Sequence, residues 1–208
     1  MAQSTARNAE RDAAQTEEGA ARNLTLLTDL YQLTMMSGYL KNGKQNDIAV
    51  FDLFFRRNSV ITYSVAAGLE QAIAYIRSIR FTEEDIAYLR SLGLFEEPFL
   101  DYLRTFRFTG DVFAVPEGTV VFPEEPILTV RAPLLEAQFV ETALLNIVNH
   151  QTLIATKAAK IAYAAAGGEV MEFGLRRAQG PDAGVYGARA AVIGGCGSTS
   201  DVLAGEMF

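Results

Sequence analysis

The stretch from Pro133 to Ala166 constrains the fold more than any other part of this chain, because it is almost continuously apolar. Pro133 suits the first turn of a helix, and Gly167-Gly168 suits its end. Such a helix must be buried on most of its surface, in a protein core or in a membrane. Six polar residues argue against a membrane span: Glu141, Asn146, Asn149, His150, Lys157 and Lys160. We therefore expect a long core helix, broken near Asn149–Thr152, in a soluble protein without a membrane partner.

After this stretch the sequence alternates between β and α patterns. A strand is expected at Glu169–Phe173, a loop at Gly174–Gly180 and a helix at Pro181–Ile193. A glycine-rich turn, Gly194–Ser200, then leads into a helical segment. This order predicts parallel β/α units. The units are too few to close a barrel, and the sequence ends within an amphipathic pattern, so we expect an incomplete α/β barrel in a truncated chain.

The region before Pro133 mixes helices and strands. A helix is expected after an N-cap at Thr28, with Gly43 as its stop, and a largely buried strand at Ile48–Phe55. Two further helices are expected at Gly68–Arg80 and Thr82–Leu92, and a small antiparallel region at 110–132. We expect an α/β protein with three parts: a disordered tail at 1–23, an N-terminal α/β domain at 24–132, and the start of the barrel domain at 133–208.

Charge and composition exclude several classes of function. The formal net charge is -7 and the pI is near 4.8, which argues against a nucleic acid partner. A ligand that carries phosphate must therefore meet local cationic groups. The single cysteine, Cys196, and the single histidine, His150, exclude a disulfide framework and a metal site built on several imidazoles. These features fit a reducing compartment, and we expect a cytoplasmic protein.

Arg176 and Arg177 are the first candidate binding residues. They lie in the string GLRRAQGPD, directly after an apolar strand and before a helix. In a parallel β/α fold this position is the carboxyl edge of the sheet, where ligands bind. A guanidinium group there can hold a carboxylate or a phosphate by two parallel hydrogen bonds. The alternative is that these arginines pair with nearby acids such as Glu172 or Asp182.

Ser198 and Thr199 are candidate phosphate-binding residues in the string GGCGSTSDVLAG. Glycines followed by hydroxyl side chains at a helix start offer free backbone N–H groups to an anion. The string is neither a P-loop nor a dinucleotide fingerprint, and a simple turn with a Ser or Thr cap explains it equally well. Cys196, within the string, is interpreted as a small packing residue.

Tyr31 and His150 are ambiguous when they are considered alone. Tyr31 lies in the first turn of the expected N-terminal helix and offers a ring for stacking, although a role in the core or an interface is the usual one. His150 lies in the long apolar helix, where a buried structural imidazole is more common than a catalytic one. Lys157 and Lys160 could reach an anion, but such lysines usually only extend along the surface.

Several long strings, taken together and in order, resemble the nicotinate phosphoribosyltransferase family. The resemblance covers Leu24 to Phe208 and rests on these strings: TDLYQLTM, FDLFFRRN, AAGLEQA, FRFTGDVFAVPEGTVVFPEEPIL, LLEAQFVETALLNIVNHQTLIATKAA, EFGLRRAQGPDAG and GGCGSTSDVLAG. It implies an enzyme that joins nicotinate to phosphoribosyl pyrophosphate, with ATP hydrolysis and Mg²⁺ as cofactors. The implied product is nicotinate mononucleotide, for NAD biosynthesis.

The resemblance also implies site residues and a fold of the type II phosphoribosyltransferase kind. The implied protein is a homodimer with active sites at the subunit boundary. Tyr31 would stack on nicotinate from the partner subunit, Arg176 would lie at the substrate or phosphate end of the pocket, and Leu175 would line it. Two alternatives stay open: a phosphoribosyltransferase for nicotinamide or quinolinate, and a non-catalytic dimerisation module.

Three departures from the family pattern accompany the resemblance. The Gly-Thr-x-Ala-His string that carries the family's phosphorylated histidine does not occur in these 208 residues, so we expect the chain alone to be inactive. Between Asn58 and Tyr63 the residues SVIT replace a Pro- and Gly-rich loop. Asp201 stands where Asn is usual, which puts its local hydrogen bonding in question.

Overall fold

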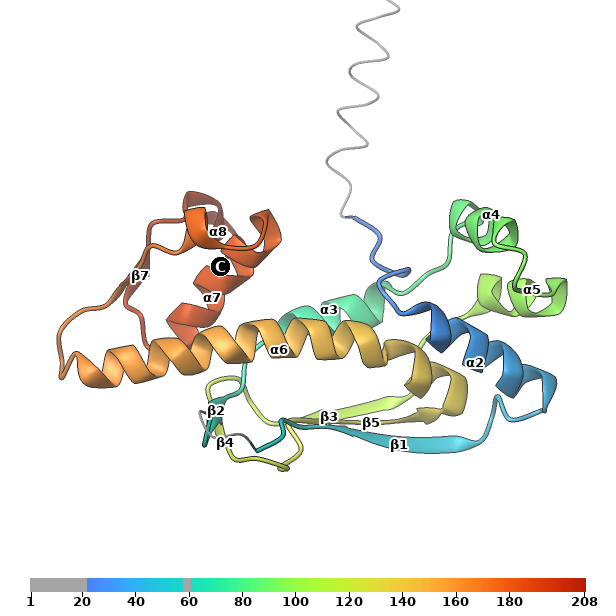
Figure 1. Cartoon of the computed structure of the whole chain (residues 1–208), viewed down its shortest axis with the longest axis horizontal. Helices are drawn as coiled ribbons and strands as arrows, with labels where there is room; N and C mark the ends of the chain where they lie inside the picture. Colours follow the sequence, from blue (N-terminus) through green and yellow to red (C-terminus); the bar gives the residue numbers. More distant parts are fainter. Residues whose placement is uncertain (1–21, 58–60) are drawn as a thin grey trace, which may run out of the picture.

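One long helix connects two units of the protein (Figure 1). The computed structural model describes residues 22–57 and 61–208. Helix α6 (Leu134–Ala164) runs through the middle, with the elements that precede it packed along its N-terminal part and its middle. The elements that follow it pack against its C-terminal part. Most of the expected tail and residues 58–60 of the SVIT connection lie outside the described residues.

The expected break in α6 is wrong, because the helix continues unbroken for 31 residues. Its polar side chains find partners without distorting the helix. The hydroxyl of Thr156 accepts a hydrogen bond from the Val65 backbone N–H at 2.9 Å and donates one to the Thr152 carbonyl at 2.6 Å. The Gln151 amide, fully buried, donates to Gln71 at 2.7 Å. Side-chain hydrogen bonding therefore satisfies these groups within a regular helix.

Two small antiparallel sheets lie beside α6, which confirms the antiparallel pattern expected for 110–132. The larger has the order β1 (Ile48–Leu53), β5 (Leu128–Pro133), β3 (Asp111–Ala114). The smaller pairs β2 (Ser64–Val65) with β4 (Val120–Val121).

The expectation that the first strand is largely buried is wrong. Ile48 is 56% exposed and Val50 is 58% exposed. The strand is exposed because β1 is at the edge of the larger sheet, where only β5 pairs with it, and because α6 lies over one face of that sheet only. A hydrophobic, β-branched strand pattern does not distinguish an edge strand from a central one.

Three expected helices before α6 are confirmed, and one was missed. They are α2 (Leu30–Lys41), α3 (Leu69–Ser78) and α4 (Glu83–Ser91). The N-cap of α2 is Asp29, not Thr28, and the Asp29 carboxylate accepts a hydrogen bond from Thr142 of α6 instead of capping the helix. The missed helix, α5 (Glu97–Thr105), has a proline in its first turn. An aromatic cluster centred on Phe139 of α6 forms the core of this unit, with ring centroids 5.3 Å from Phe81 and 5.1 Å from Phe106.

The C-terminal unit is a β/α/β arrangement, as expected. It contains β6 (Met171–Glu172), the 3₁₀ helix η1 (Leu175–Arg177), α7 (Pro181–Ile193), β7 (Ser198–Thr199) and α8 (Val202–Met207). The two strands are parallel, and α7 connects them. The expectation that Ser198 and Thr199 stand at a helix start is wrong, because they pair with β6, and α8 begins later with Asp201 as its N-cap.

The expected domain boundary near Ala132-Pro133 coincides with the end of β5, and α6 begins at the next residue. Because α6 packs on elements from both sides of this point, the division at 132/133 stays a prediction.

Candidate functional site

The carboxyl ends of β6 and β7 form one edge of the C-terminal unit. Residues 173–180 leave β6 at this edge, and residues 200–201 leave β7 beside them. The Ser200 backbone N–H donates to the Glu172 carbonyl at 3.0 Å, so the two segments begin in contact. Parallel strands present their ligand-binding loops at this edge. The structure thus brings together Leu175, Arg176, Arg177, Ser198 and Thr199.

The two arginines of this edge differ in their contacts. Arg177 donates from Nη1 to the Phe173 carbonyl at 3.3 Å. Within residues 22–57 and 61–208, Arg176 has no hydrogen-bond or ion-pair partner, and its side chain is exposed. Neither arginine pairs with Glu172 or Asp182, and Asp182 instead forms an ion pair with Arg22 at 2.8 Å. Both guanidinium groups are therefore accessible to an anion, and that of Arg176 is also free of protein partners among the described residues.

Glu172 occupies the space between the two strand ends. Its carboxylate accepts hydrogen bonds from the Thr199 hydroxyl at 2.6 Å and from the Gly174 backbone N–H. The Thr199 hydroxyl also accepts from the Asp201 backbone N–H at 3.0 Å. The Thr199 hydroxyl thus donates one hydrogen bond and accepts another within the protein. The buried hydroxyl of Ser198 has no partner among the described residues. Asp201 caps α8 by accepting from the Ala204 N–H at 3.2 Å through Oδ1, whereas its Oδ2, which is buried, has no partner among the described residues.

Tyr31 lies on α2 and faces outward. Its side chain is 49% exposed, and Met35, one turn later, is 40% exposed. The Tyr31 hydroxyl accepts a hydrogen bond from the Gln32 amide at 2.9 Å. Partial desolvation, followed by the charges of Glu141 and Asp29, raises the pKa of Tyr31 above its ordinary value. The phenol is consequently neutral at physiological pH and available for stacking.

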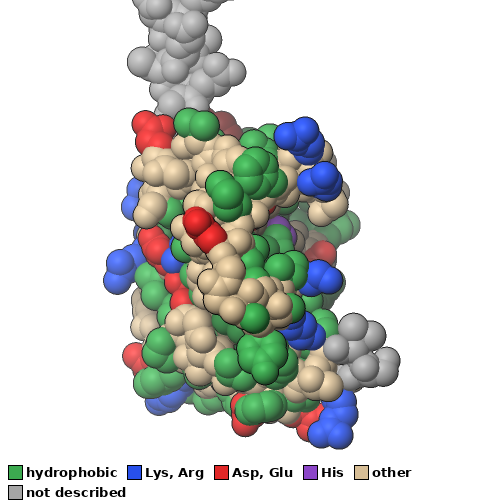
Figure 2. Space-filling model, turned by 90° about the vertical axis from the view of Figure 1, so that its left-hand side faces the viewer, with side chains coloured by type: hydrophobic (Ala, Val, Ile, Leu, Met, Phe, Trp, Pro, Cys, Tyr) green, Lys and Arg blue, Asp and Glu red, His purple; other side chains and the backbone are tan. Residues whose placement is uncertain are grey.

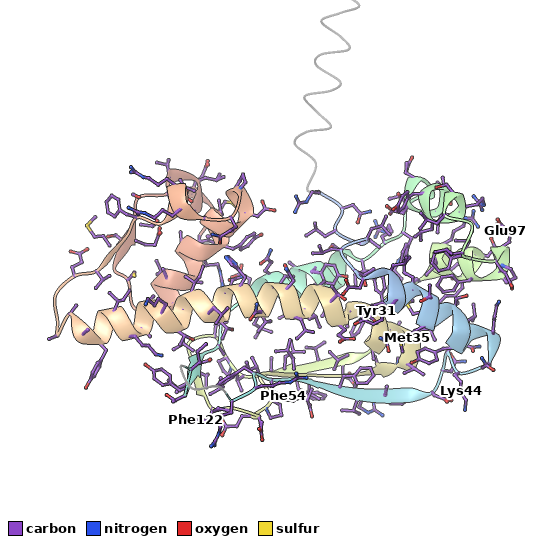
Figure 3. All side chains as sticks on the ribbon, viewed as in Figure 1. Tyr31, Met35, Lys44, Phe54, Glu97 and Phe122 are labelled. Carbon is purple, nitrogen blue, oxygen red and sulfur yellow. The ribbon has the colours of Figure 1, made fainter. Side chains whose placement is uncertain are left out.

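Tyr31 and Arg176 do not meet within one copy of the chain. Tyr31 is held near the start of α6 through Gln32 and Glu141, whereas η1 packs on α7, beside the far half of that helix. Figure 3 shows Tyr31 on α2, well apart from the C-terminal unit. A helix rises about 1.5 Å per residue, so α6 extends over roughly 45 Å. A single site containing both residues therefore requires two chains.

An arginine that the sequence did not point to joins the two units. Arg189 of α7, whose side chain is 12% exposed, forms ion pairs with Glu117 at 2.7 Å and Glu70 at 2.5 Å. Glu117 also accepts hydrogen bonds from the backbone N–H groups of Gly68 and Leu69 at the start of α3. Hydrogen bonding to Arg189 lowers the pKa of the Glu117 carboxyl and raises that of the Arg189 guanidinium. This cluster links α7 to Glu117 and to α3, with Glu117 20% exposed and Glu70 69% exposed at its rim.

The surroundings of His150 and Cys196 indicate structural roles in packing. His150 faces α7 at Gly187, and burial lowers its pKa below the ordinary value. Cys196 is 7% exposed, and burial, followed by the charge of Glu172, raises the pKa of its thiol. A protonated, buried thiol is a packing group, as interpreted from the sequence.

The described residues contain no group of three His, Cys, Asp or Glu side chains that could hold a metal ion. In the same residues, none of the helices has the length and apolar character needed to cross a membrane.

The end of the molecule that bears the C-terminal unit exposes many hydrophobic side chains (Figure 2). They belong to α6, β6, α8 and the adjoining segments: Tyr163, Met171, Phe173, Leu175, Val202, Leu203, Met207 and Phe208. Exposed apolar surface of this extent is typical of a face that packs against further protein.

Comparisons with known proteins agree on one family. Residues 26–149 match the family model described as the nicotinate phosphoribosyltransferase (NAPRTase) N-terminal domain. The nicotinate phosphoribosyltransferase of Bacillus subtilis is 50% identical over 187 residues, which is 89% of this chain and 38% of the relative. A Mycobacterium tuberculosis nicotinate phosphoribosyltransferase is 45% identical over 88% of this chain and 40% of the relative. The chain thus spans less than half the length of these relatives.

Two solved structures share the fold. The human nicotinic acid phosphoribosyltransferase superposes with a TM-score of 0.79 at 40% identity, covering 86% of this chain and 37% of that one. A nicotinate-nucleotide pyrophosphorylase from Pyrococcus furiosus superposes with a TM-score of 0.68 at 26% identity, covering 89% and 40%. The family match covers more than half of the sequence, and the fold agrees with it. The chain therefore belongs to the nicotinate phosphoribosyltransferase family.

Proposed function

We propose that this chain contributes to a cytoplasmic nicotinate phosphoribosyltransferase. The reaction joins nicotinate to the ribose of phosphoribosyl pyrophosphate and releases nicotinate mononucleotide and pyrophosphate, with ATP hydrolysis. Family membership supports this assignment, and the observation that carries it in the structure is the separation of Tyr31 from Arg176. Both residues are accessible. Tyr31 offers an aromatic face for the ring of an aromatic acid, and Arg176 offers a cation for its carboxylate.

The proposed site forms between two copies of the chain in a homodimer. In a two-fold dimer both copies use the same surface, and a contact between residue i of one copy and residue j of the other is repeated in reverse, so two equivalent sites arise. Tyr31 from one copy would lie against the ring of nicotinate held at the β6/β7 edge of its partner. Leu175, which is 44% exposed, would line the pocket beside Arg176.

The chemistry is a displacement at the anomeric carbon of the ribose. The ring nitrogen supplies the electron pair of the new C–N bond, and the electron pair of the breaking C–O bond leaves with pyrophosphate. Positive charge develops on the sugar and negative charge on the leaving group, so the protein must align the reactants and neutralise the pyrophosphate. Arg176 and Arg177 are the accessible cations at this edge, and Ser198 carries a buried hydroxyl without a partner among the described residues. The Thr199 hydroxyl would donate to a phosphate only if its hydrogen bond to Glu172 were broken.

Two further parts of the proposal come from the family. The reaction is proposed to use Mg²⁺ and ATP, but the described residues offer no three-ligand metal cluster, so no step is assigned to the ion. The parallel β6-α7-β7 unit, with its exposed apolar surface, is proposed as the beginning of an irregular α/β barrel.

Subunit complementation tests the shared site. A polypeptide that continues this sequence to the length of its relatives is prepared with Tyr31→Ala and, separately, with Arg176→Ala, and each is assayed for nicotinate mononucleotide. We expect both to be nearly inactive alone, and their mixture, after subunit exchange, to recover about a quarter of the unaltered activity, since half of the dimers are mixed and each carries one intact site. Full activity in either single variant would refute the assigned roles.

A substrate panel on the unaltered polypeptide separates the alternative functions. Product from nicotinate alone supports the proposal, whereas a preference for nicotinamide or quinolinate assigns the sister activity. Dimerisation without product from any of the three supports the non-catalytic module.

A further inference from the structure

Gln32 stands behind Tyr31 and is fully buried between α2 and α6. Its amide nitrogen lies 2.7 Å from Oε2 of Glu141 and 2.9 Å from the hydroxyl oxygen of Tyr31. Its amide oxygen accepts a hydrogen bond from the Gln138 side chain, which is 6% exposed. A buried amide with three polar neighbours has a defined orientation, because its nitrogen must face hydrogen-bond acceptors and its oxygen must face donors.

The Glu141 carboxylate fixes that orientation. An ionised carboxylate only accepts hydrogen bonds, so the Gln32 group facing it must be the amide nitrogen and not the oxygen. The two hydrogens of that nitrogen are then directed to Glu141 and to Tyr31. With the nitrogen as donor in both bonds, the Tyr31 oxygen must be the acceptor.

The proton of the Tyr31 hydroxyl therefore points away from Gln32. Among the described residues, no other hydrogen bond to this hydroxyl is formed. The side chain is 49% exposed, so the proton faces solvent on the outer side of α2.

We propose that Gln32, held by Glu141 and Gln138, is a positioning residue that makes the Tyr31 hydroxyl an outward-facing hydrogen-bond donor. A ligand that stacks on the Tyr31 ring would then meet a donor at the ring's edge and would need an acceptor there, such as a carboxylate or phosphate oxygen. This last step rests on the proposed function. The direction of the hydrogen bond does not, and it can be tested in this chain alone.

The test replaces Tyr31 with 3,5-difluorotyrosine, which ionises closer to neutral pH and reports its charge by fluorine NMR. Titrations compare the otherwise unaltered chain with Gln32→Met. If Gln32 donates to the phenol oxygen, its loss removes a group that stabilises the phenolate, and the pKa of residue 31 shifts upward. A downward shift, or no shift, overturns the proposal, because it would mean that the phenol was the donor or that the bond was absent.

Two controls accompany this titration. Asp29→Asn removes a negative charge near Tyr31 and keeps the carboxylate that orients Gln32, so the pKa of residue 31 should shift downward. The same label at Tyr88, which is 56% exposed on α4, should titrate alike in all three proteins.

A second measurement needs no substitution at Gln32. Neutron diffraction from a deuterated crystal of the chain should show the Tyr31 deuteron directed away from the Gln32 nitrogen. A deuteron located between these two atoms would overturn the proposal, whatever substrate the protein uses.

Discussion

Arg189 of α7 holds both carboxylate oxygens of Glu117, with Nη1–Oε1 and Nη2–Oε2 distances of 2.8 and 2.7 Å. Arg189→Met would leave the carboxylate, 20% exposed, with only its backbone donors. We expect the free energy of unfolding to fall by about 2–4 kcal/mol, as measured by urea denaturation. Arg90→Met, at the exposed pair with Glu97, is the matched control and should lower the free energy of unfolding much less, because solvent screens this pair. Equal losses for both variants would contradict a special role for Arg189.

The stability contributed by this pair should depend on pH. Hydrogen bonding to Arg189 lowers the pKa of folded Glu117 below its ordinary 4.5, so the folded state favours the ionised form. The contribution is therefore present above the unfolded pKa and is lost as the pH falls through the folded one. Denaturation of the unaltered chain and of Glu117→Gln should give a stability difference that is constant near pH 6–7 and shrinks below about pH 4. A difference that grows on acidification would contradict this sign.

Gly194, the C-cap of α7, packs directly against α6. A Cβ atom at this position would clash with the Ala155 carbonyl and the Ala158 side chain, both on α6. Gly194→Ala should destabilise the protein by about 1–3 kcal/mol through overpacking. Gly38→Ala, in α2, meets no atom within 4 Å and should be neutral or stabilising by up to about 1 kcal/mol. Thermal unfolding of the two variants checks the contrast, and a neutral Gly194→Ala would show that the helices can separate without cost.

Thr82 forms a capping box at the start of α4. Its hydroxyl accepts from the Asp85 N–H at 3.2 Å, and the Asp85 carboxylate accepts from the Thr82 N–H at 2.8 Å. Thr82→Ala should lower the free energy of unfolding by about 1 kcal/mol. Thr105→Ala, exposed at the end of α5, should change it by no more than about 0.5 kcal/mol. Urea denaturation distinguishes these values, and equal effects would contradict the capping role.

The 208-residue chain alone should produce no nicotinate mononucleotide from nicotinate and phosphoribosyl pyrophosphate. The resemblance assigns the phosphorylated histidine to a string that these residues lack, and their one histidine, His150, packs between α6 and α7. Chromatographic detection of the product, compared with a blank without protein, checks this. Turnover above the blank would show that neither that histidine nor a larger barrel is required.

Local sequence signals predicted the elements whose ends are marked by proline, glycine or capping residues. The helix Pro181–Ile193 was predicted to the residue, because a proline can start a helix and glycines flank it. The predicted start of the next helix at Thr82 agrees with its N-cap, and acidic residues occupy the first turn. The loop carrying Arg176 was correctly placed after a strand and before a helix.

Tertiary pairing, which short patterns do not encode, decided the remaining elements. Ser198 and Thr199 form a strand because Glu172 lies beside them, and no feature of GGCGSTS identifies that partner. Helix α6 stays intact through Asn149–Thr152 because residues distant in sequence, such as Gln71, satisfy its polar groups. Arg189 had no local signal, since its partners Glu117 and Glu70 lie far away in the chain.

Because α6 is unbroken, the number of its residues sets both the distance and the rotation between the two units of the protein. Each residue of a helix advances the chain by about 1.5 Å and turns it by about 100°. One residue inserted in the middle of α6 would rotate α7 around the axis of α6. Arg189 would then lie away from the side on which Glu117 binds it. The length of α6 therefore sets how the two units face each other, and a change of length would need to be close to a whole number of turns to keep Arg189 beside Glu117.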